Sequence, residues 1–392
     1  YDVPMRVVGA NVPYEWLIYL LMFIPIGIFI YGFYEKARVW YLAKGELHRN
    51  DKVGARIWSW FVFSFAQARV IRKPLAGWMH AFLFWGFLVL ALAAGVDASH
   101  FWLGFPHIEG SSYIGFSAVV DILGLMALIG IIVLAAIRYI QKPERLNDTR
   151  AEDGWMILLI FVILLTGYFI EGLRISAQIQ MSTTFDQIAY EQLASPIGWV
   201  FASMFGGMTV DSALMWHRIL WWFHMAIAFV FIAIIPFTKL WHIFTSMLNY
   251  AFRDLEPSAC RMVENIEEAE SFGVENIEDF GWKDLLDLDA CIRCGRCQEN
   301  CPAFNTGKHL NPKLTLIQAM KEHLDAKAPY LLAAKASGEV EEMAMTEEAA
   351  EAPNPMEASL LYDIVTTEVI WDCTNCRACM EHCPMFIEHI PK

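Results

Sequence analysis

Eight cysteines in the last third of the chain have the regular spacing of iron–sulfur ligands. Two stretches, DACIRCGRCQENCPAFN at 289–305 and DCTNCRACMEHCPMF at 372–386, both read C-x2-C-x2-C-x3-C-P. Thiolates at this spacing are typical of 4Fe–4S clusters rather than of disulfides. The two motifs therefore predict two clusters, with ligands drawn from Cys291, Cys294, Cys297, Cys301, Cys373, Cys376, Cys379 and Cys383.

Zinc is the alternative for each motif, because four thiolates also suit a tetrahedral Zn²⁺ site. The second copy of the same spacing favours clusters. Thiolates that bind metal persist in a reducing compartment, so the motifs indicate the cytoplasm. The ninth cysteine, Cys260, lies outside both motifs and is expected to be a buried or free thiol.

The composition indicates a membrane protein with an acidic soluble domain. Of 392 residues, 56% are hydrophobic and 18% are charged, and the mean hydropathy is +0.38. Residues 1–253 contain 18 Lys and Arg against 16 Asp and Glu, whereas residues 254–392 contain 11 against 27. We therefore expect a membrane domain over 1–253 and a soluble domain over 254–392.

The acidic second half argues against nucleic acid as a partner. The net charge is −16 for the second half and +2 for the first half, which gives −14 for the whole chain. Such a surface suits a soluble partner with a basic face, and an ordinary solvated acidic surface is the equal alternative.

Five long apolar segments predict five membrane-spanning helices. At 1.5 Å per residue, each is long enough to cross about 30 Å of hydrocarbon. No secretory signal is visible. A shorter aromatic stretch, 58–70, predicts a helix lying along the inner leaflet. The five segments are 16–34, 77–96, 116–139, 155–175 and 219–237.

The basic residues between these segments predict the orientation of the chain. Nine Lys and Arg lie within 36–73 and four within 138–150, whereas 97–115 and 176–216 contain none. Positive loops stay inside. The N-terminus is therefore expected outside, and the cysteine-rich tail is expected in the cytoplasm of a bacterial or archaeal cell.

Histidines within or beside these segments are candidate metal ligands, because ionisable side chains inside a membrane are costly and usually functional. His80 lies near the inner end of the second segment, His224 near the outer end of the fifth, and His242 just past its inner end. As one helix, the 18 residues between His224 and His242 would cover about 27 Å. His80 and His242 are then expected to share an inner haem iron.

An outer iron requires a partner for His224. His100, 20 residues after His80 and thus about 30 Å above it on a helix, has a matching depth. His217, seven residues before His224, is the competing candidate. For each histidine, the alternative is an interfacial or hydrogen-bonded side chain.

Two parts of the sequence resemble known protein families. The run HMAIAFVFIAIIPFTKLWHIFTSMLNY at 224–250 resembles the fifth helix of the nitrate reductase gamma subunit, a five-helix dihaem cytochrome b that exchanges electrons with quinones. The twin cysteine motifs resemble the α-helical ferredoxin part of heterodisulfide reductase-type proteins. The combination of both parts in this order most resembles the membrane-bound electron transfer flavoprotein:menaquinone oxidoreductase family. The membrane subunits of sulfite-reduction complexes are the second family that it resembles.

The resemblance covers nearly the whole chain from about residue 14 and implies an all-α fold. A five-helix transmembrane cytochrome b bundle would precede a cytoplasmic α-helical dicluster ferredoxin domain. In such folds the cysteine before proline ligates the other cluster. Cluster one would then be bound by Cys291, Cys294, Cys297 and Cys383, and cluster two by Cys373, Cys376, Cys379 and Cys301.

Two features depart from these families. The gamma subunit has a second histidine ten residues after the first in its second helix, and the corresponding place after His80 is Leu90 here, so one or two haems are possible. Members of the fused family also continue into cysteine-rich CCG domains. Because this sequence ends at Lys392, nine residues after Cys383, we expect either a longer chain or a partner subunit that supplies that part.

The resemblance implies a quinone oxidoreductase of the respiratory chain that connects a cytoplasmic flavoprotein with menaquinone. Charged residues near the outer helix ends are candidates for proton handling at a quinone site, and a capping or interfacial role is the alternative for each. Two other classes remain: an anchor subunit of a heterodisulfide reductase-like or sulfite-reduction-associated complex, and a redox sensor. The candidate charged residues are Asp97, Glu171, Arg174, Asp211 and Arg218.

The insert between the cysteine motifs, 306–371, is rich in Ala, Glu, Leu and Lys and predicts helices. A loop is expected at 352–355, which reads APNP. The acidic stretch 339–351 is expected to be exposed and is a candidate docking segment.

Overall fold

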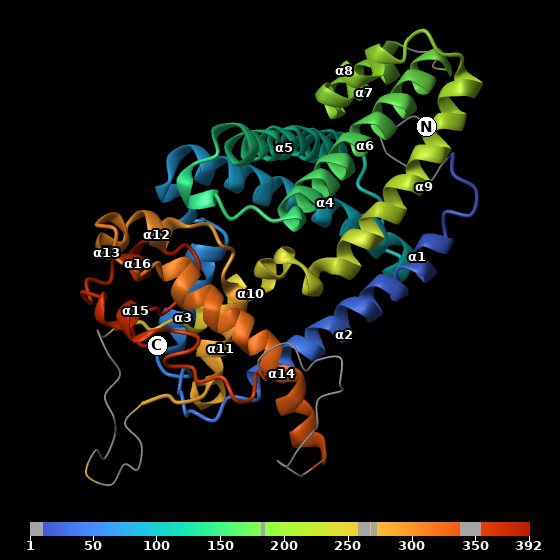
Figure 1. Ribbon diagram of the computed structural model, residues 1–392. Helices are drawn as coiled ribbons and strands as arrows, with labels where there is room; N and C mark the ends of the chain where they lie inside the picture. The colour runs from blue at the N-terminus through green and yellow to red at the C-terminus, as the bar shows by residue number, and fades with distance from the viewer. Residues whose placement is uncertain (1–10, 182–184, 258–266, 268–272, 338–353) are drawn as a thin grey trace. The chain divides into compact units, whose positions relative to one another are not determined.

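The described part of the chain contains helices joined by turns and loops, with two isolated bridges and no strand (Figure 1). The structure, a computed structural model, describes residues 11–181, 185–257, 267, 273–337 and 354–392. The all-α fold class is confirmed. Cys260 and the acidic stretch 339–351 lie outside the described residues.

The chain folds into two compact units. Unit 1 comprises 1–29, 70–142 and 149–235, and unit 2 comprises 30–69, 143–148 and 236–392. The second unit therefore includes not only the cysteine motifs but also two of the connections between apolar helices. The division at residue 253 stays a prediction.

Within the described residues, five helices are long and apolar enough to cross a membrane, as the sequence predicts. Each extends beyond the apolar segment that predicted it, because polar residues continue the helix at one or both ends. The five are Leu17–Trp40, which contains α1 (Leu17–Leu21) and α2 (Phe23–Trp40), Pro74–Leu103 (α4), Gly110–Gln141 (α5, Gly110–Ala136, with a π-helical turn, Ile137–Gln141), Ala151–Met181 (α6), and Val210–Phe237, which begins with α9 (Val210–Ile234).

Helices α4 and α5 of unit 1 approach each other closely at two glycines. A Cβ on Gly86 would lie 2.5 Å from the carbonyl oxygen of Leu123, and one on Gly130 would lie 2.6 Å from that of Met79. Small residues let helix backbones approach without the side-chain burial that drives packing in water. The pair thereby forms a rigid part of the bundle that carries His80.

A buried carboxylate in α5 fixes a short helix of unit 1. Helix α8 (Pro196–Met204) starts with proline, and the backbone N–H groups of Ile197 and Gly198 donate to Asp121 at 2.6 and 3.2 Å. These are groups that a helix start leaves without intrahelical partners. Asp121 is therefore explained by helix capping. Helix α7 (Phe185–Ala194) precedes α8.

The fifth spanning helix does not continue to His242. Helix α9 ends at Ile234, and two 3₁₀ turns, Ile235–Phe237 and Lys239–Trp241, precede α10 (His242–Phe252). Pro236 has no N–H to donate and disfavours a helical residue before it. The expectation that one continuous helix joins His224 to His242 was therefore wrong.

Unit 2 consists of short helices around the cysteine motifs. Helix α3 runs from Val53 to Ser64, so the helix expected over 58–70 begins earlier and ends earlier. Helix α14 (Ala319–Ser337) confirms a helix in the insert. The remaining helices are α11 (Trp282–Ala290), α12 (Arg296–Glu299), α13 (Pro302–Asn305), α15 (Thr367–Trp371) and α16 (Ala378–His382), with 3₁₀ turns at Glu144–Leu146 and Ile277–Asp279 and a π-helical turn at Pro312–Gln318.

Candidate functional site

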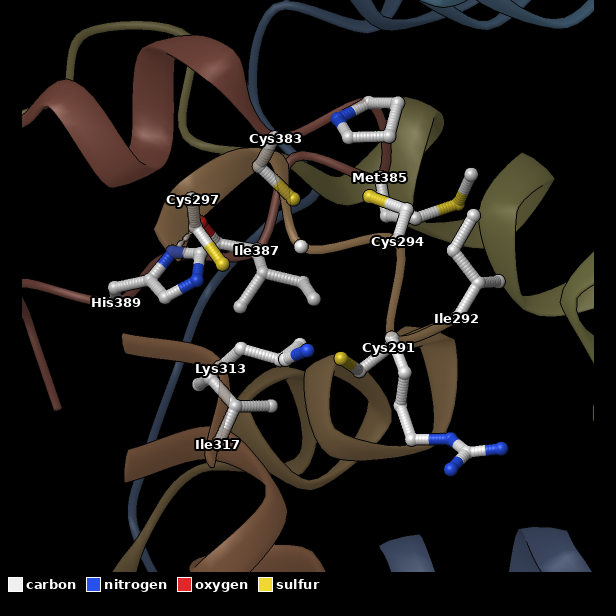
Figure 2. Close-up of a pocket in the computed structure, with 13 residues that line it drawn as sticks. Cys291, Ile292, Cys294, Cys297, Lys313, Ile317, Cys383, Met385, Ile387 and His389 are labelled. Atoms are coloured by element: carbon white, nitrogen blue, oxygen red, sulfur yellow. Dashed lines mark hydrogen bonds between the residues drawn. The ribbon is translucent and has the colours of Figure 1, made fainter. Parts of the chain in front are cut away.

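Four cysteines from both motifs line one cavity in unit 2. Cys291, Cys294 and Cys297 of the first motif meet Cys383 of the second (Figure 2). The cavity has a volume of about 320 Å³ with its mouth included. Apolar side chains complete the walls: Ile292, Ile317, Met385 and Ile387. This is the set that the sequence assigned to cluster one.

The sulfurs of this set surround a space rather than meeting at one point. Among the described residues, no three His, Cys, Asp or Glu side chains are close enough to hold a single metal ion. A cluster of several irons bound by four thiolates requires sulfurs on the walls of a cavity. The arrangement therefore fits a 4Fe–4S cluster.

The two motifs have the same backbone path. Arg293 and Gly295, on either side of Cys294, have left-handed φ values of 54° and 70°, and Asn375 and Arg377, on either side of Cys376, have 56° and 63°. Alternating left-handed residues turn successive N–H groups toward one point, an arrangement that binds anions and occurs at iron–sulfur sites. Both motifs are therefore shaped for a negatively charged group.

Glycine is required in the first motif for a second reason. A Cβ on Gly295 would lie 2.3 Å from the carbonyl oxygen of Arg145. The second motif has Arg377 at the equivalent place, which an L-residue occupies only with strain. The first motif is therefore packed more tightly against its surroundings.

The second set of cysteines is more exposed than the first. Cys301 and Cys379 are buried, whereas Cys373 and Cys376 are exposed. Burial, followed by the thiols of Cys373, Cys301 and Cys376, raises the pKa of Cys379 to about 12. These four thiols are therefore close enough to interact, and they are the set assigned to cluster two.

The two sets are adjacent. Helices α12 and α16, which carry Cys297 and Cys379, pack against each other. Burial raises the pKa of Cys297, and the thiols of Cys294, Cys383, Cys291 and Cys379 raise it further. Cys297 thus interacts with members of both sets.

Three thiols of the first set, those of Cys291, Cys297 and Cys383, are held where burial makes them resist deprotonation. Burial raises the pKa of Cys291 to about 11 and raises that of Cys383 further. Crowded, buried thiolates need positive charge to offset their repulsion, and iron supplies it when the ligands lose their protons. The chemistry of the donor set thus agrees with its geometry.

Basic residues lie beside the first set of cysteines, and the sequence did not identify them as part of the site. Lys313 lines the cavity, and its ammonium donates to the carbonyl of Arg145 and to the carboxylate of Asp148, both at 2.9 Å. Arg145 donates to the carbonyl of Cys294 at 2.6 Å. Arg145 and Asp148 lie in the short connection 143–148, and the sequence pattern did not indicate that this loop contacts the cysteines.

Arg69 supports the loop that carries Cys383. It donates to the carbonyls of Met380 and Cys383 at 2.9 and 3.1 Å, and its guanidinium lies 3.7 Å from the ring centroid of Phe386. Cation–π contacts of this kind gain strength when they are partly desolvated. A residue counted from the sequence only for orientation therefore positions a cysteine.

A buried ion network lies beside the first set. Lys283 and Lys392 contact the carboxylate of Asp287 at 2.5 and 2.6 Å, and Asn249 donates to it at 2.7 Å. Burial alone would raise the pKa of Asp287, but the two ammonium groups hold it below its usual value. The network joins α10, α11 and the residues that follow Cys383.

Two candidate haem ligands of unit 1 have one ring nitrogen occupied. Nδ1 of His224 lies 2.9 Å from the hydroxyl of Thr166, whose own hydrogen is donated to the carbonyl of Val162. His100 lies within α4, with Nδ1 2.6 Å from the carbonyl of Phe105 and its ring stacked on His107. In both rings Nδ1 is therefore the donor.

His217 has the opposite arrangement. The amide nitrogen of Asn11 lies 3.4 Å from its Nδ1, and the amide oxygen accepts from Arg218 at 2.8 Å, which fixes the orientation of the amide. Nδ1 of His217 therefore accepts. The proton of the neutral ring is then on Nε2.

His80 and His242 lie in different units. His80 is partly buried on α4. His242 begins α10, and its Nδ1 lies 2.7 Å from the carbonyl of Lys239. Burial foremost lowers the pKa of His242, which favours a neutral ring. Like His224 and His100, His242 donates from Nδ1.

The charged candidates for proton handling divide into separate groups. Glu171 and Arg174 form ion pairs with each other at 2.8 Å, and Arg174 pairs with Glu191 at 2.7 Å. The hydroxyl of Ser195 donates to Glu171 at 2.9 Å. Asp211 lies in the first turn of α9, Arg218 binds Asn11, and Asp97 lies in α4.

Comparison with known families identifies two domains. Residues 94–257 match the nitrate reductase gamma subunit family, and residues 287–387 match the 4Fe–4S dicluster domain. The match to the gamma family includes His100, His217, His224 and His242, whereas His80 lies before it. The fused architecture expected from the sequence is thus confirmed, and the second domain supports two 4Fe–4S clusters.

The curated relatives of this chain are longer than it. An EtfAB:quinone oxidoreductase of Syntrophomonas wolfei is 79% identical over 100% of this chain and 55% of its own length. A probable iron-sulfur-binding oxidoreductase, FadF, of Bacillus subtilis is 29% identical over 93% of this chain and 53% of its own length. The chain thus spans about half the length of these relatives. No solved structure matches it.

Proposed function

Since this chain belongs to the same family as the EtfAB:quinone oxidoreductase, we propose that it transfers electrons between a soluble electron transfer flavoprotein and menaquinone in the membrane, with two 4Fe–4S clusters and b-type haem as cofactors. When bound, these cofactors pass single electrons, whereas flavin and quinone each exchange two. The chain's residues must therefore hold the cofactors in place and manage the protons of the quinone.

One structural observation carries this proposal. Unit 2 is built from both cysteine motifs together with 30–69, 143–148 and 236–252, which adjoin or connect the spanning helices. Trp40, at the end of the first span, donates to Asp289 at 2.7 Å, and Arg145 binds the Cys294 carbonyl. The cluster ligands are thus fixed to the ends of the spans.

The same contacts support the proposed orientation. Connections 36–73 and 138–150 hold the excess of Lys and Arg, and residues from both contact the cysteine motifs. Positive connections remain in the cytoplasm. We place unit 2 there and the N-terminus outside.

We assign His80 and His242 to an inner haem, and His224 to a second, outer haem. A histidine bound to a metal through Nε2 usually donates its Nδ1 hydrogen to an oxygen acceptor. His242 and His224 both do so, with Lys239 and Thr166 as acceptors.

His100 is the better partner for His224 than His217. His100 donates from Nδ1 and keeps Nε2 for a metal, whereas His217 accepts at Nδ1 from Asn11. For His217 to bind iron through Nε2, the Asn11 contact would have to break. The replacement of a histidine by Leu90 on α4 is then compensated by a ligand ten residues further along the helix.

The group formed by Glu171, Arg174 and Glu191 is the candidate for proton handling at the quinone. Two carboxylates share one guanidinium, so one of them is able to gain a proton while the other still balances the positive charge. Asp211 and Arg218 lack such an arrangement among the described contacts. The quinone site is therefore proposed beside α6 and α7.

The protein in proteoliposomes prepared without menaquinone provides the test. Reduced electron transfer flavoprotein should reduce the haem, followed by oxidation of the haem on addition of excess menaquinone. Haem absorbance would be recorded during both additions. If a quinol analogue reduced the haem while the flavoprotein reduced nothing, the partner would belong to another complex, as expected for an anchor subunit.

A further inference from the structure

We propose that the apolar surface beside Cys373 and Cys376 is the docking site for the soluble redox flavoprotein. This inference rests on the proposed function and names its site. The surface is defined by the side chains of Leu361, Tyr362, Ile370 and Trp371, and is called the Trp371 surface below.

Large apolar side chains are unusually exposed on this short segment. Trp371 is 81% exposed, Tyr362 71%, Ile370 45% and Leu361 38%. Single exposed apolar residues are common, but a group of them marks an interaction site. Trp and Tyr are also the residues that contribute most to binding at protein interfaces.

The fold of the segment does not need these side chains. Leu360, Val365 and Val369 are buried and already anchor it. A tight bridge joins Leu361 to Val365, and α15 begins two residues later. The exposed ring of Tyr362 therefore belongs to the turn, and that of Trp371 lies at the end of α15.

Tyr362 is held in a costly backbone conformation. Its φ is 88°, although it is neither glycine nor asparagine. Such conformations cost free energy and occur mainly where function requires them. The strained turn presents the ring of Tyr362 to solvent.

The Trp371 surface adjoins the exposed cysteine set. Cys373 follows Trp371 by two residues, and its N–H donates to the carbonyl of Ile370 at 3.1 Å. The cavity of the other set is lined by buried or partly buried cysteines. A protein that binds at Trp371 therefore covers the more accessible of the two sets.

The charge around this surface indicates which kind of partner binds there. Glu357, Asp363 and Glu368 are exposed and lie within four positions of its residues in sequence, in a domain of net charge −16. The nearby Lys308 is paired with Asp372 at 3.6 Å. An anionic membrane surface would be repelled by these carboxylates. A flavoprotein whose apolar contact is surrounded by Lys and Arg is attracted, and attraction of this kind speeds association.

The experiment measures reduction of the protein by purified, reduced electron transfer flavoprotein over a range of flavoprotein concentrations. Trp371→Ala should raise the KM for the flavoprotein about tenfold or more, the cost of losing a central interface residue. Glu368→Lys and Asp363→Lys should raise it mainly at low salt. Tyr41→Ala, which removes an aromatic side chain 77% exposed in the same unit, is the matched control and should leave the KM unchanged.

Cluster EPR after reduction by dithionite separates docking from cofactor loss. It should be the same in the Trp371→Ala variant and the parent protein. If the EPR is intact and the KM is unchanged, docking at Trp371 is wrong. An increase in the rate on deletion of 340–351 would mean that this segment covers the surface, and conversion of a dimer to a monomer by Trp371→Ala at unchanged KM would mean that a second copy covers it. Both results would overturn the proposal.

Failure of the proposed function would look different. The parent protein would then not be reduced by the flavoprotein at any concentration, although a quinol analogue would still reduce the haem.

Discussion

Cys383 and Cys291 face the same cavity, although almost the whole dicluster domain separates them in sequence. The crossing arises because α12 and α16 pack together, each with an identical left-handed path around its cysteines. Each set of four is therefore complete only when both motifs have folded.

The exchange of Cys383→Ser should damage the cluster of the first motif. Its other ligands are Cys291, Cys294 and Cys297, and serine binds iron less well than a thiolate does. EPR of the reduced variant should show a changed signal for this cluster and an unchanged signal for the other. A perturbation confined to the second cluster would contradict the assignment.

Lys313→Met should lower the midpoint potential of the cluster in this cavity. The buried ammonium lines the cavity, and without it the added negative charge of the reduced state is less well stabilised. Because the Asp148 carboxylate partly offsets the charge of the ammonium, the reduced state should lose about 1 kcal/mol of stabilisation. For one electron, this lowers the midpoint potential by roughly 40 mV. Potentiometric titration followed by EPR measures it.

Lys335→Met is the control for this prediction. Lys335 is exposed and donates to the carbonyl of Tyr41, away from the cysteines. Its removal should shift neither cluster. Equal shifts in both variants would show that net charge, rather than the position of Lys313, sets the potential.

The tautomers of the histidines predict different haem contents for two variants. His224→Ala should remove one low-spin haem, because Nε2 of His224 is the proposed ligand. His217→Ala should retain both haems, since Nδ1 of His217 accepts from Asn11 and its Nε2 carries the proton. Reduced-minus-oxidised absorbance spectra and pyridine haemochrome content of membranes measure the difference.

The inner haem gives a separate test of pairing. His80→Ala and His242→Ala should abolish the same spectral component, because the two imidazoles share one iron in our assignment. If His80→Ala and His224→Ala instead removed the same component, while His242→Ala removed none, the protein would hold one haem between His80 and His224.

Lys283→Met should strongly destabilise unit 2. Lys283 is fully buried against Asp287, and removal of one partner leaves a buried charge less compensated, at a cost of about 3–5 kcal/mol. Chemical denaturation, with cluster absorbance as the signal, measures this change. The paired variant Lys283→Met with Asp287→Leu should recover part of the loss, and a double variant as unstable as the single one would argue against the pair.

Acid should weaken the same network. The pKa of Asp287 is held below its usual value, so its ion pairs stabilise the fold above the pKa of an unfolded aspartate. This contribution is lost as the pH falls through the folded pKa of Asp287. The parent protein should therefore lose stability on acidification more steeply than the paired variant.

The sequence predicted the features that have local signals. Apolar runs predicted all five spans, and cysteine spacing predicted the eight ligands, four of which line one cavity. Contacts made through the tertiary fold were not predictable in this way. Arg145 and Asp148 looked like ordinary loop charges, because nothing near them in sequence indicates that they pack against Cys294 and Lys313.

The interruption of the helix between His224 and His242 had a signal in the local sequence, but the apolar pattern around it favoured a continuous helix. Pro236 disfavours a continuous helix, but the apolar run continues through it to Phe237. The choice between His100 and His217 depended on Asn11, which lies about 200 positions away in the chain and gives no sequence pattern to read.

The unequal exposure of the two cysteine sets also bears on survival in air. Dioxygen and peroxide reach a cluster through solvent, so the one bound by Cys373 and Cys376 meets them first. The other lies behind apolar walls and should outlast it. Protein handled aerobically would then lose the exposed cluster first and retain the buried one, so that oxidation would interrupt electron transfer at one cluster and leave the other intact.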